Sequence, residues 1–174
     1  MNLYLRLLLV VLRAWAGRSL DPLATARTPF RVWPHDLDVN LHMNNGRYAT
    51  LMDLGRVDLM ARAGMLGAVR REGLMPVVTG QHLTYRRALP PFARFEIATR
   101  VAGWDERNVY LEQVFTRGGE VAMRGLVQTL FLKGGKRLPS AELVVLFGME
   151  GDRPVPEDVA ALFPHPARRQ PVAA

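Results

Sequence analysis

Apolar residues recur with helical spacing in two segments of the first half of the chain. Leu3–Trp15 is apolar except for Arg6 and Arg13, and this pattern predicts a helix. Asn45–Gly64 predicts a longer helix, since Asn44 is a suitable N-cap and apolar residues occupy most of the circumference. A helix that is apolar on most sides is expected to be enclosed by other structure.

The second half of the chain has the alternation and turn signals of antiparallel strands. The sequence Gly118-Gly119 favours a hairpin, and Lys133–Arg137 is expected to form another turn. A short helix, Ala141–Phe147, is expected to follow. The predicted strands are Phe30–Trp33, Met75–Leu89 with a bend at Gly80, Phe95–Val101, Val109–Arg117 and Val121–Leu132.

These elements predict an α+β fold, in which an antiparallel sheet of about five strands wraps around one long central helix. The organisation expected is an N-terminal apolar helix and linker over residues 1–28, a globular domain over 29–150 and a C-terminal extension over 151–174, unstructured from Pro164. A single sheet of this kind has exposed edges, so we expect the chain to form a homo-oligomer.

The apolar segment Leu3–Trp15 leaves three interpretations open. It is shorter than the roughly 20 residues of a membrane-spanning helix, and its uninterrupted apolar run, Leu7–Leu12, is short for a signal peptide. It could pack on its own domain or on a partner subunit. It could lie in a membrane interface with snorkelling arginines, or it could be a targeting signal.

Composition narrows the classes of function. The chain carries a net charge of +7, which suits a polyanionic partner such as nucleic acid, anionic lipid or a phosphorylated small molecule. The basic residues are scattered without interleaved aromatics, which argues against nucleic acid. No cysteine is present, which excludes thiol catalysis, disulfides and zinc–thiolate sites and is typical of a cytoplasmic protein.

The segment Asp36–Tyr48 holds the richest chemistry. It places two carboxylates, a histidine and several carboxamides just before the predicted N-terminus of the long helix, where free backbone amides can polarise a carbonyl group. Such a loop predicts a hydrolytic site. The alternatives are plainer: Asp36 and Asp38 could cap turns, and His42 could be an ordinary loop histidine.

The order of a strand, Asp-Leu-Asp-x-x-x-His-Met-Asn-Asn-x-x-Tyr, a long helix and antiparallel strands resembles the hotdog-fold acyl-CoA thioesterases of the 4-hydroxybenzoyl-CoA thioesterase type. The likeness covers about Pro29–Phe147. It implies that Asp38 is the catalytic carboxylate and that the backbone amide of Asn45, with Gly46 next to it, polarises the thioester carbonyl. Many members have glycine where this chain has Leu41, which is expected to alter the shape of the pocket.

Other residues are candidates with competing explanations. Some hotdog thioesterases carry their acid about two turns into the helix, which makes Asp53 the alternative catalytic acid, although an ion pair with Arg56 would also explain it. The expected substrate-binding residues are His42, Asn44, Gly46 and Tyr48, and Arg86 and Arg87 for the phosphates of coenzyme A. Each could instead serve as a turn, core or surface residue.

The resemblance implies hydrolysis of an acyl-CoA, or a related acyl thioester, to a carboxylic acid and a thiol in lipid metabolism. It implies no metal or redox cofactor, an active site at a subunit interface and a cytoplasmic protein, with peripheral membrane contact through Leu3–Trp15 as a further option. Two alternatives stay open. One is a non-catalytic acyl-CoA or lipid-binding module at a membrane, and the other is a dehydratase of 3-hydroxyacyl thioesters that would use His42.

Overall fold

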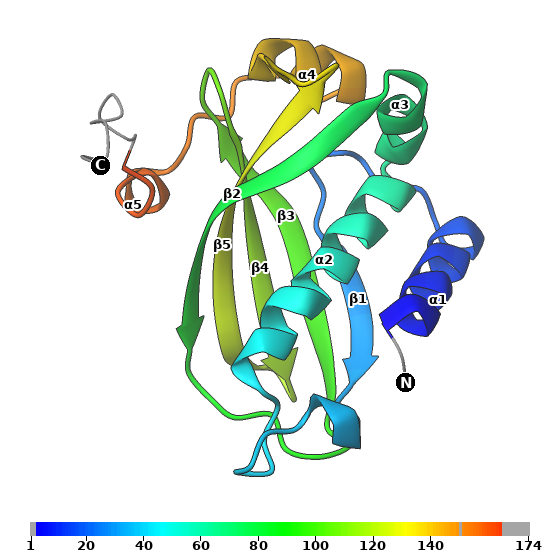
Figure 1. Cartoon of the computed structure of the whole chain (residues 1–174), viewed down its shortest axis with the longest axis vertical. Helices are drawn as coiled ribbons and strands as arrows, with labels where there is room; N and C mark the ends of the chain where they lie inside the picture. Colours follow the sequence, from blue (N-terminus) through cyan, green and yellow to red (C-terminus); the bar gives the residue numbers. More distant parts are fainter. Residues whose placement is uncertain (1–2, 150, 165–174) are drawn as a thin grey trace, which may run out of the picture.

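The computed structural model describes residues 3–149 and 151–164 of the chain. One antiparallel sheet curves around the long helix α2 (Asn45–Arg62), which confirms the predicted hotdog architecture (Figure 1). The strands are β1 (Ala26–Arg31), β2 (Leu74–Tyr85), β3 (Arg94–Trp104), β4 (Val109–Arg117), β5 (Glu120–Lys133) and β6 (Lys136–Leu138). Their order is β1-β3-β4-β5-β2, with β6 paired to β5.

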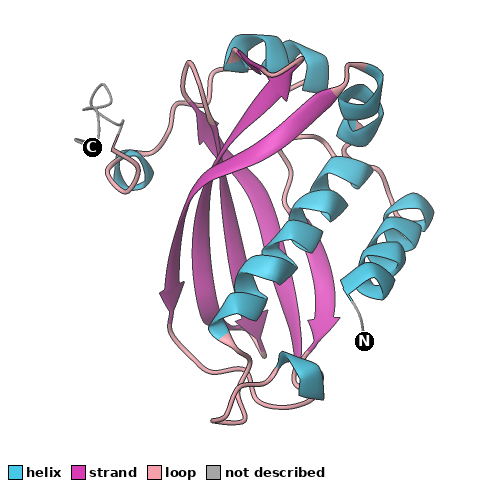
Figure 2. Cartoon of the chain, in the orientation of Figure 1, coloured by secondary structure: helices cyan, strands magenta, loops and turns pink. Residues whose placement is uncertain are grey.

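The remaining helices lie around this unit. They are α1 (Leu3–Ala16), the 3-10 turn η1 (Pro34–Asp36), α3 (Met65–Arg71), α4 (Ser140–Phe147) and α5 (Glu157–Ala160). Figure 2 shows α1 beside α2, while η1 and the loop that enters α2 lie at the end of the molecule opposite α3 and α4. None of the helices in the described part of the chain is long and apolar enough to cross a membrane.

The core forms where α2 lies against the concave face of the sheet. Tyr48, Leu51, Met52 and Leu59 of α2 are fully or almost fully buried there. Gly55 allows an unusually close approach, because a Cβ atom at this position would lie 2.8 Å from the Thr99 hydroxyl and 2.9 Å from the Gln113 amide nitrogen.

The side chain of Gln113 forms hydrogen bonds across this close contact between helix and sheet. Its amide nitrogen donates to the carbonyl of Met52 at 2.9 Å and to the Thr99 hydroxyl at 3.0 Å, while its oxygen accepts from Arg56 at 2.8 Å. The buried polar groups between helix and sheet are therefore paired with one another.

Several boundaries differ from those predicted. The first strand begins at Ala26 rather than Phe30, because residues 26–31 pair with β3, and Pro29 is tolerated on this edge strand. The strand β2 ends at Tyr85 rather than Leu89, although the predicted irregularity is present between Val78 and Gly80. Residues 136–138 form β6 instead of completing a turn, since they pair back onto β5. The helix α3 was not predicted.

A C-terminal strap, residues 151–163, crosses the outer face of the sheet. The Trp104 amide donates to the Arg153 carbonyl at 3.1 Å, and the Arg153 side chain donates to the Val101 carbonyl at 2.9 Å. A Cβ atom at Gly103 would lie 2.8 Å from the Pro154 carbonyl oxygen, so the strap lies directly on the strand. Its apolar residues Val159 and Phe163 are buried. The predicted unstructured tail falls outside the described residues, apart from Pro164.

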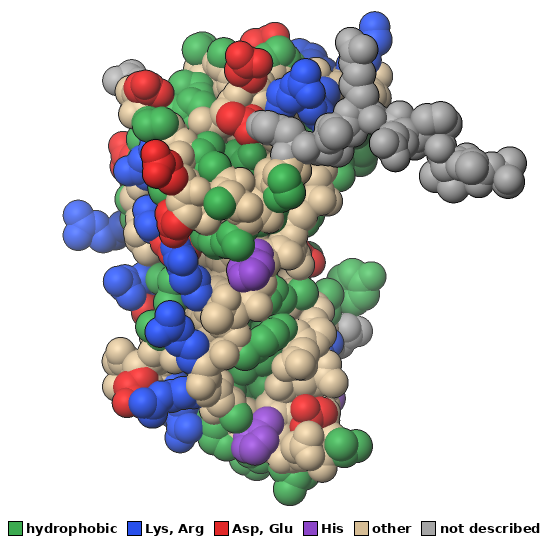
Figure 3. Space-filling model, turned by 90° about the vertical axis from the view of Figure 1, so that its left-hand side faces the viewer, with side chains coloured by type: hydrophobic (Ala, Val, Ile, Leu, Met, Phe, Trp, Pro, Cys, Tyr) green, Lys and Arg blue, Asp and Glu red, His purple; other side chains and the backbone are tan. Residues whose placement is uncertain are grey.

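The strand β2 forms one edge of the sheet and carries no charged residue along its 12 positions. Most of it is exposed on both faces, and Met75, Val78 and Tyr85 remain 55%, 41% and 42% exposed. Figure 3 faces this side of the molecule, where uncharged and hydrophobic side chains run down the middle and Lys and Arg gather along the left border.

Candidate active site

The segment between η1 and α2 folds into a tight loop. Leu37 and Met43 form an antiparallel bridge, and the Asp38 amide donates to the His42 carbonyl at 2.9 Å. Leu41 closes the loop with a left-handed backbone, φ +57°. This conformation explains why glycine suits the position before His42, since a side chain there costs roughly 1–2 kcal/mol.

The carboxylate of Asp38 is half-buried in this loop. Its Oδ1 atom accepts the amides of Asn40 at 2.9 Å and His42 at 3.4 Å, as expected for an aspartate that caps a turn. Its Oδ2 atom takes part in none of the hydrogen bonds found among the described residues, which leaves an oxygen for chemistry. Burial, the neighbouring Tyr85 and the charge of Asp38 raise the pKa of Tyr48 to about 12. Asp38 belongs to the loop that the Leu37–Met43 bridge closes just before α2.

The N-cap of α2 determines which backbone amide can bind an oxyanion. The side-chain oxygen of Asn44 accepts the Gly46 amide at 2.8 Å, and the main-chain carbonyl of Asn44 accepts the Arg47 amide at 2.9 Å. The amide of Asn45 donates to no acceptor within the described part of the chain. Of the two amides at the start of α2, the Asn45 amide is therefore the free one, while Gly46 is engaged by the cap.

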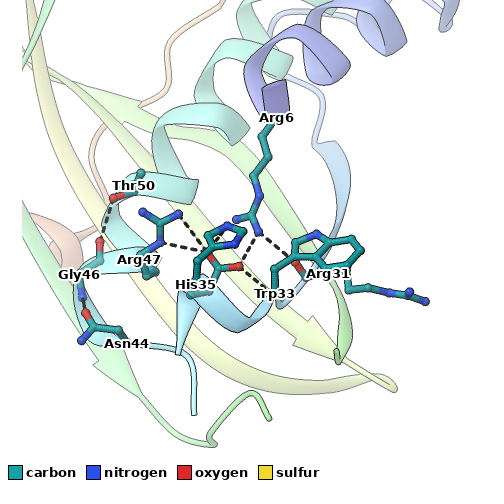
Figure 4. Close-up of polar contacts among 9 residues, drawn as sticks. Arg6, Arg31, Trp33, His35, Asn44, Gly46, Arg47 and Thr50 are labelled. Carbon is teal, nitrogen blue, oxygen red and sulfur yellow. Dashed lines mark hydrogen bonds and ion pairs between the residues drawn. The ribbon is translucent and has the colours of Figure 1, made fainter. Parts of the chain in front are cut away.

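Asp36 holds the loop in place through its buried carboxylate. Its carboxylate is fully buried and contacts Arg6 of α1 at 2.5 Å, the Trp33 amide at 2.9 Å and Arg47 of α2 at 2.9 Å (Figure 4). Its carbonyl also accepts the Asn44 amide at 2.8 Å. The structural role expected for Asp36 is confirmed, and it joins α1, the end of β1 and the first turn of α2.

The protonation of Asp36 follows from these contacts. Burial alone would raise the pKa of its carboxyl group. The hydrogen bonds from Arg6, the Trp33 amide and Arg47, together with the charge of Arg6, outweigh burial and hold the pKa of Asp36 below its ordinary value. Asp36 is thus a fixed anion with no free oxygen and is not a candidate nucleophile.

The alternative acid, Asp53, lies elsewhere. It is 61% exposed and forms the expected ion pair with Arg56, one turn further along α2. Eight residues separate it from Asn45, or about 12 Å along the helix axis. The loop that carries Asp38 and the free Asn45 amide therefore both belong to the N-terminal end of α2, and Asp53 does not.

Asp53 does border an apolar cavity of about 250 Å³ between α2 and the sheet. Apart from Asp53, Arg56 and Thr129, apolar side chains line it, including Pro76 and Val78 of the edge strand β2. An apolar cavity that reaches an open sheet edge can accept an acyl or aryl group.

The predicted substrate-binding residues fall into two groups. His42, Asn44 and Gly46 are exposed at the loop, whereas Tyr48 is buried in the core between the rings of Tyr85 and Phe115. The Tyr85 hydroxyl donates to the Asn45 carbonyl at 3.4 Å, a contact for which no local sequence pattern is a signal.

The two arginines expected to meet coenzyme A phosphates lie just after β2. Arg87 forms an exposed ion pair with Glu120 at 2.5 Å, and Arg86 is exposed. Both side chains are accessible to a soluble ligand.

A family model, the thioesterase-like superfamily, matches residues 32–163 of this chain, which includes the whole loop, α2 and β2–β5. The chain belongs to this superfamily. Protein THEM6 of Danio rerio is 39% identical over 113 residues, covering 64% of this chain and 56% of the zebrafish protein. Thioesterase poxG of Penicillium oxalicum is 27% identical over 109 residues, covering 55% and 36%. The chain spans about half the length of the THEM6 proteins it matches.

Solved structures share the fold. The probable thioesterase YbaW of Escherichia coli superposes with a TM-score of 0.65 at 23% identity, covering 69% of this chain and 94% of YbaW. SAV2348 of Staphylococcus aureus, solved in complex with CoA, superposes with a TM-score of 0.61 at 15% identity, covering 82% and 96%. These structures, both under 25% identical to this chain, show the fold that the chain shares with them.

Proposed function

We propose that this chain hydrolyses an acyl-CoA, or a related acyl thioester, with Asp38 as the catalytic carboxylate and the Asn45 amide as the oxyanion donor. The observation that carries the proposal is the free amide of Asn45 at the start of α2, together with a carboxylate in the adjoining loop that has one uncommitted oxygen. A carboxylate supplies or activates the attacking oxygen, and an amide at a helix start stabilises the charge that develops on the carbonyl oxygen. One such donor lowers the barrier by about 3–4 kcal/mol.

Two routes fit this geometry. In the first, Asp38 attacks the carbonyl carbon, the thiolate leaves and takes a proton, and water then cleaves the mixed anhydride. In the second, Asp38 removes a proton from water, the resulting hydroxide attacks, and the C–S bond breaks in the same way. In both, the oxyanion points at the Asn45 amide, and the products are a carboxylic acid and a free thiol.

The uncharged edge of β2 supports a homo-oligomer in which two copies pair along this strand. Natural edge strands usually carry charges, prolines or bulges that limit such pairing. The strand β2 has Pro76 and the irregularity between Val78 and Gly80, but it carries no Lys, Arg, Asp or Glu. Pairing would place a second chain over the open side of the apolar cavity, next to Pro76 and Val78. The active site would then take its loop from one subunit and its walls from both.

Release of free thiol from a panel of short, long and aromatic acyl-CoAs tests the proposal. We expect Asp38→Asn to lower kcat by at least about 100-fold, the scale of a lost acid–base group, with little change in ligand affinity. The matched control is Asp53→Asn, which removes an exposed carboxylate and should keep turnover within about threefold. Loss of turnover in Asp53→Asn but not in Asp38→Asn would show that the wrong acid is assigned.

The alternative function is a binding module without catalysis. It predicts that acyl-CoA binds in the micromolar range, measured by calorimetry, while no acyl-CoA of the panel is cleaved. Cleavage that depends on Asp38 excludes it.

A further inference from the structure

The helix α1 exposes an apolar face. Its buried positions include a charged residue, Arg6, which is only 2% exposed, together with Val10 and Ala14. Apart from Arg13, the side that faces solvent is largely apolar along the length of the helix. Its exposed large hydrophobic residues are Tyr4 (76%), Leu5 (47%), Leu8 (52%), Leu9 (36%), Leu12 (47%) and Trp15 (75%).

The contacts beneath α1 fix this orientation. Arg6 is held by the fully buried Asp36 and donates to the Arg31 carbonyl at 3.4 Å. Rotating the helix to bury the leucines would pull Arg6 away from its counter-ion, and breaking a buried pair costs about 3–5 kcal/mol. Of the two arginines of α1, Arg6 therefore points inward, whereas Arg13 is exposed.

A basic groove borders this apolar face. It has a volume of about 530 Å³ between α1 and the end of β1, and Arg6, Arg13, Arg31 and Arg94 line it together with apolar side chains. No Asp or Glu is among the lining residues.

The arginines of the groove stand close to one another. Arg31 and Arg94 are direct cross-strand partners, an arrangement in which like charges repel. Leu9 and Arg13 line the groove and are also exposed on α1, so the groove and the apolar face adjoin.

We propose that α1 and this groove together form a docking surface for an anionic lipid membrane. An apolar helix face beside cationic side chains matches the layering of a bilayer interface, in which acyl chains lie beneath anionic phosphates. Tyr4 and Trp15 stand near the two ends of the face and suit the headgroup region. A helix of 14 residues is about 21 Å long and lies along the surface.

Charge selects lipid over a second copy of this chain. Arg6 is already neutralised by Asp36, but two copies joined through α1 would bring two sets of Arg13, Arg31 and Arg94 together without an acidic residue of the groove to neutralise them. A phosphate-bearing surface neutralises them instead. This inference does not depend on thioester hydrolysis.

Co-sedimentation of the full chain with phosphatidylcholine vesicles, with and without 30% phosphatidylglycerol, tests the proposal. We expect binding that requires the anionic lipid and weakens at 0.5 M salt. The variant Leu8→Glu/Leu12→Glu should lower the bound fraction at least tenfold, and Arg31→Gln/Arg94→Gln should remove the preference for anionic lipid. Both leucines are about half exposed, so circular dichroism should show an intact fold.

The matched control is Val145→Glu, which places a charge at an apolar residue that is 81% exposed on α4, away from α1. It should bind vesicles like the parent protein. The proposal fails if the parent does not sediment with anionic vesicles, or if Leu8→Glu/Leu12→Glu sediments as well as the parent. It also fails if that variant instead converts a dimer to a monomer in light scattering without vesicles, since α1 would then bind a second copy.

Discussion

Replacing Asp36 by asparagine should strongly destabilise the protein, although the side chain keeps its shape. The carboxylate is fully buried and is the only acidic partner of Arg6 within the described residues. One terminal nitrogen of Arg6 already lacks a hydrogen-bond partner there. Asp36→Asn therefore leaves a buried guanidinium without a counter-ion.

The magnitude follows from burial. Removing one member of a buried ion pair costs about 3–5 kcal/mol. Arg47, the second cation, is 27% exposed and can turn toward water, so its loss adds about 1 kcal/mol or less. The helix α1 can also undock and hydrate Arg6, which limits the cost to the docking energy of that helix. We expect a loss of about 3 kcal/mol.

A double-mutant cycle isolates the pair. Arg6→Met should cost about 2 kcal/mol, because Asp36 keeps Arg47 and the Trp33 amide. Arg6→Met/Asp36→Asn should cost no more than Asp36→Asn alone, since no buried charge is left unpaired. Urea unfolding followed by circular dichroism measures all three. Additive costs, or a cost below 1 kcal/mol for Asp36→Asn, would refute the reasoning.

The same carboxylate predicts an acid-sensitive stability. The pKa of Asp36 is lowered in the folded protein, so the unfolded chain takes up this proton first as the pH falls. The contribution of Asp36 is fully present above the unfolded pKa of about 4 and is lost as the pH falls through the lower, folded value. Between about pH 5 and pH 3, the free energy of unfolding should fall more steeply for the parent than for Asp36→Asn.

Three further changes test other features. Leu41→Gly should raise the free energy of unfolding by about 0.5–1 kcal/mol, because the backbone strain of a side chain at φ +57° exceeds the entropy cost of glycine. A loss of stability in urea titrations would contradict this. Gly55→Ala should lower the free energy of unfolding by about 1–2 kcal/mol, because the new methyl group displaces Thr99 and Gln113 and this outweighs the better helix propensity of alanine. A gain in melting temperature would show instead that helix and sheet can move apart to accommodate it. Val78→Lys should shift the oligomer toward monomer in light scattering, if the β2 edge is the contact, and an unchanged mass would exclude that edge.

Local signals predicted much of the fold. The helix α2 begins at Asn45, as its cap Asn44 indicated, and it ends two residues before Gly64. The hairpin at Gly118-Gly119 separates β4 and β5 as expected. Each of these features depends on neighbours in the sequence, so the sequence alone identifies them.

Features that depend on distant partners were missed or misplaced. The strand β1 contains polar residues and is defined by its pairing with β3, some 70 residues away. The prediction relied on the apolar cluster Phe30–Trp33 instead, and it therefore put the strand too far along the chain. The ion pair of Arg6 with Asp36 spans 30 residues and has no local signal. The loop motif did identify Asp38 and the Asn45 amide as candidates, but only the cap geometry shows that Gly46 is engaged and Asn45 is free.

The strap has a consequence for how larger assemblies can be built. Because residues 151–163 lie flush against Gly103, and Phe163 would be 3.0 Å from a Cβ atom at Gly80, that part of the convex surface is already sealed by the protein's own chain. A back-to-back stack of two sheets there would first have to peel this segment away and expose Val159 and Phe163 to water. Pairing along a free sheet edge would need no such rearrangement, so the C-terminal strap disfavours back-to-back stacking of two sheets more than it disfavours side-by-side pairing.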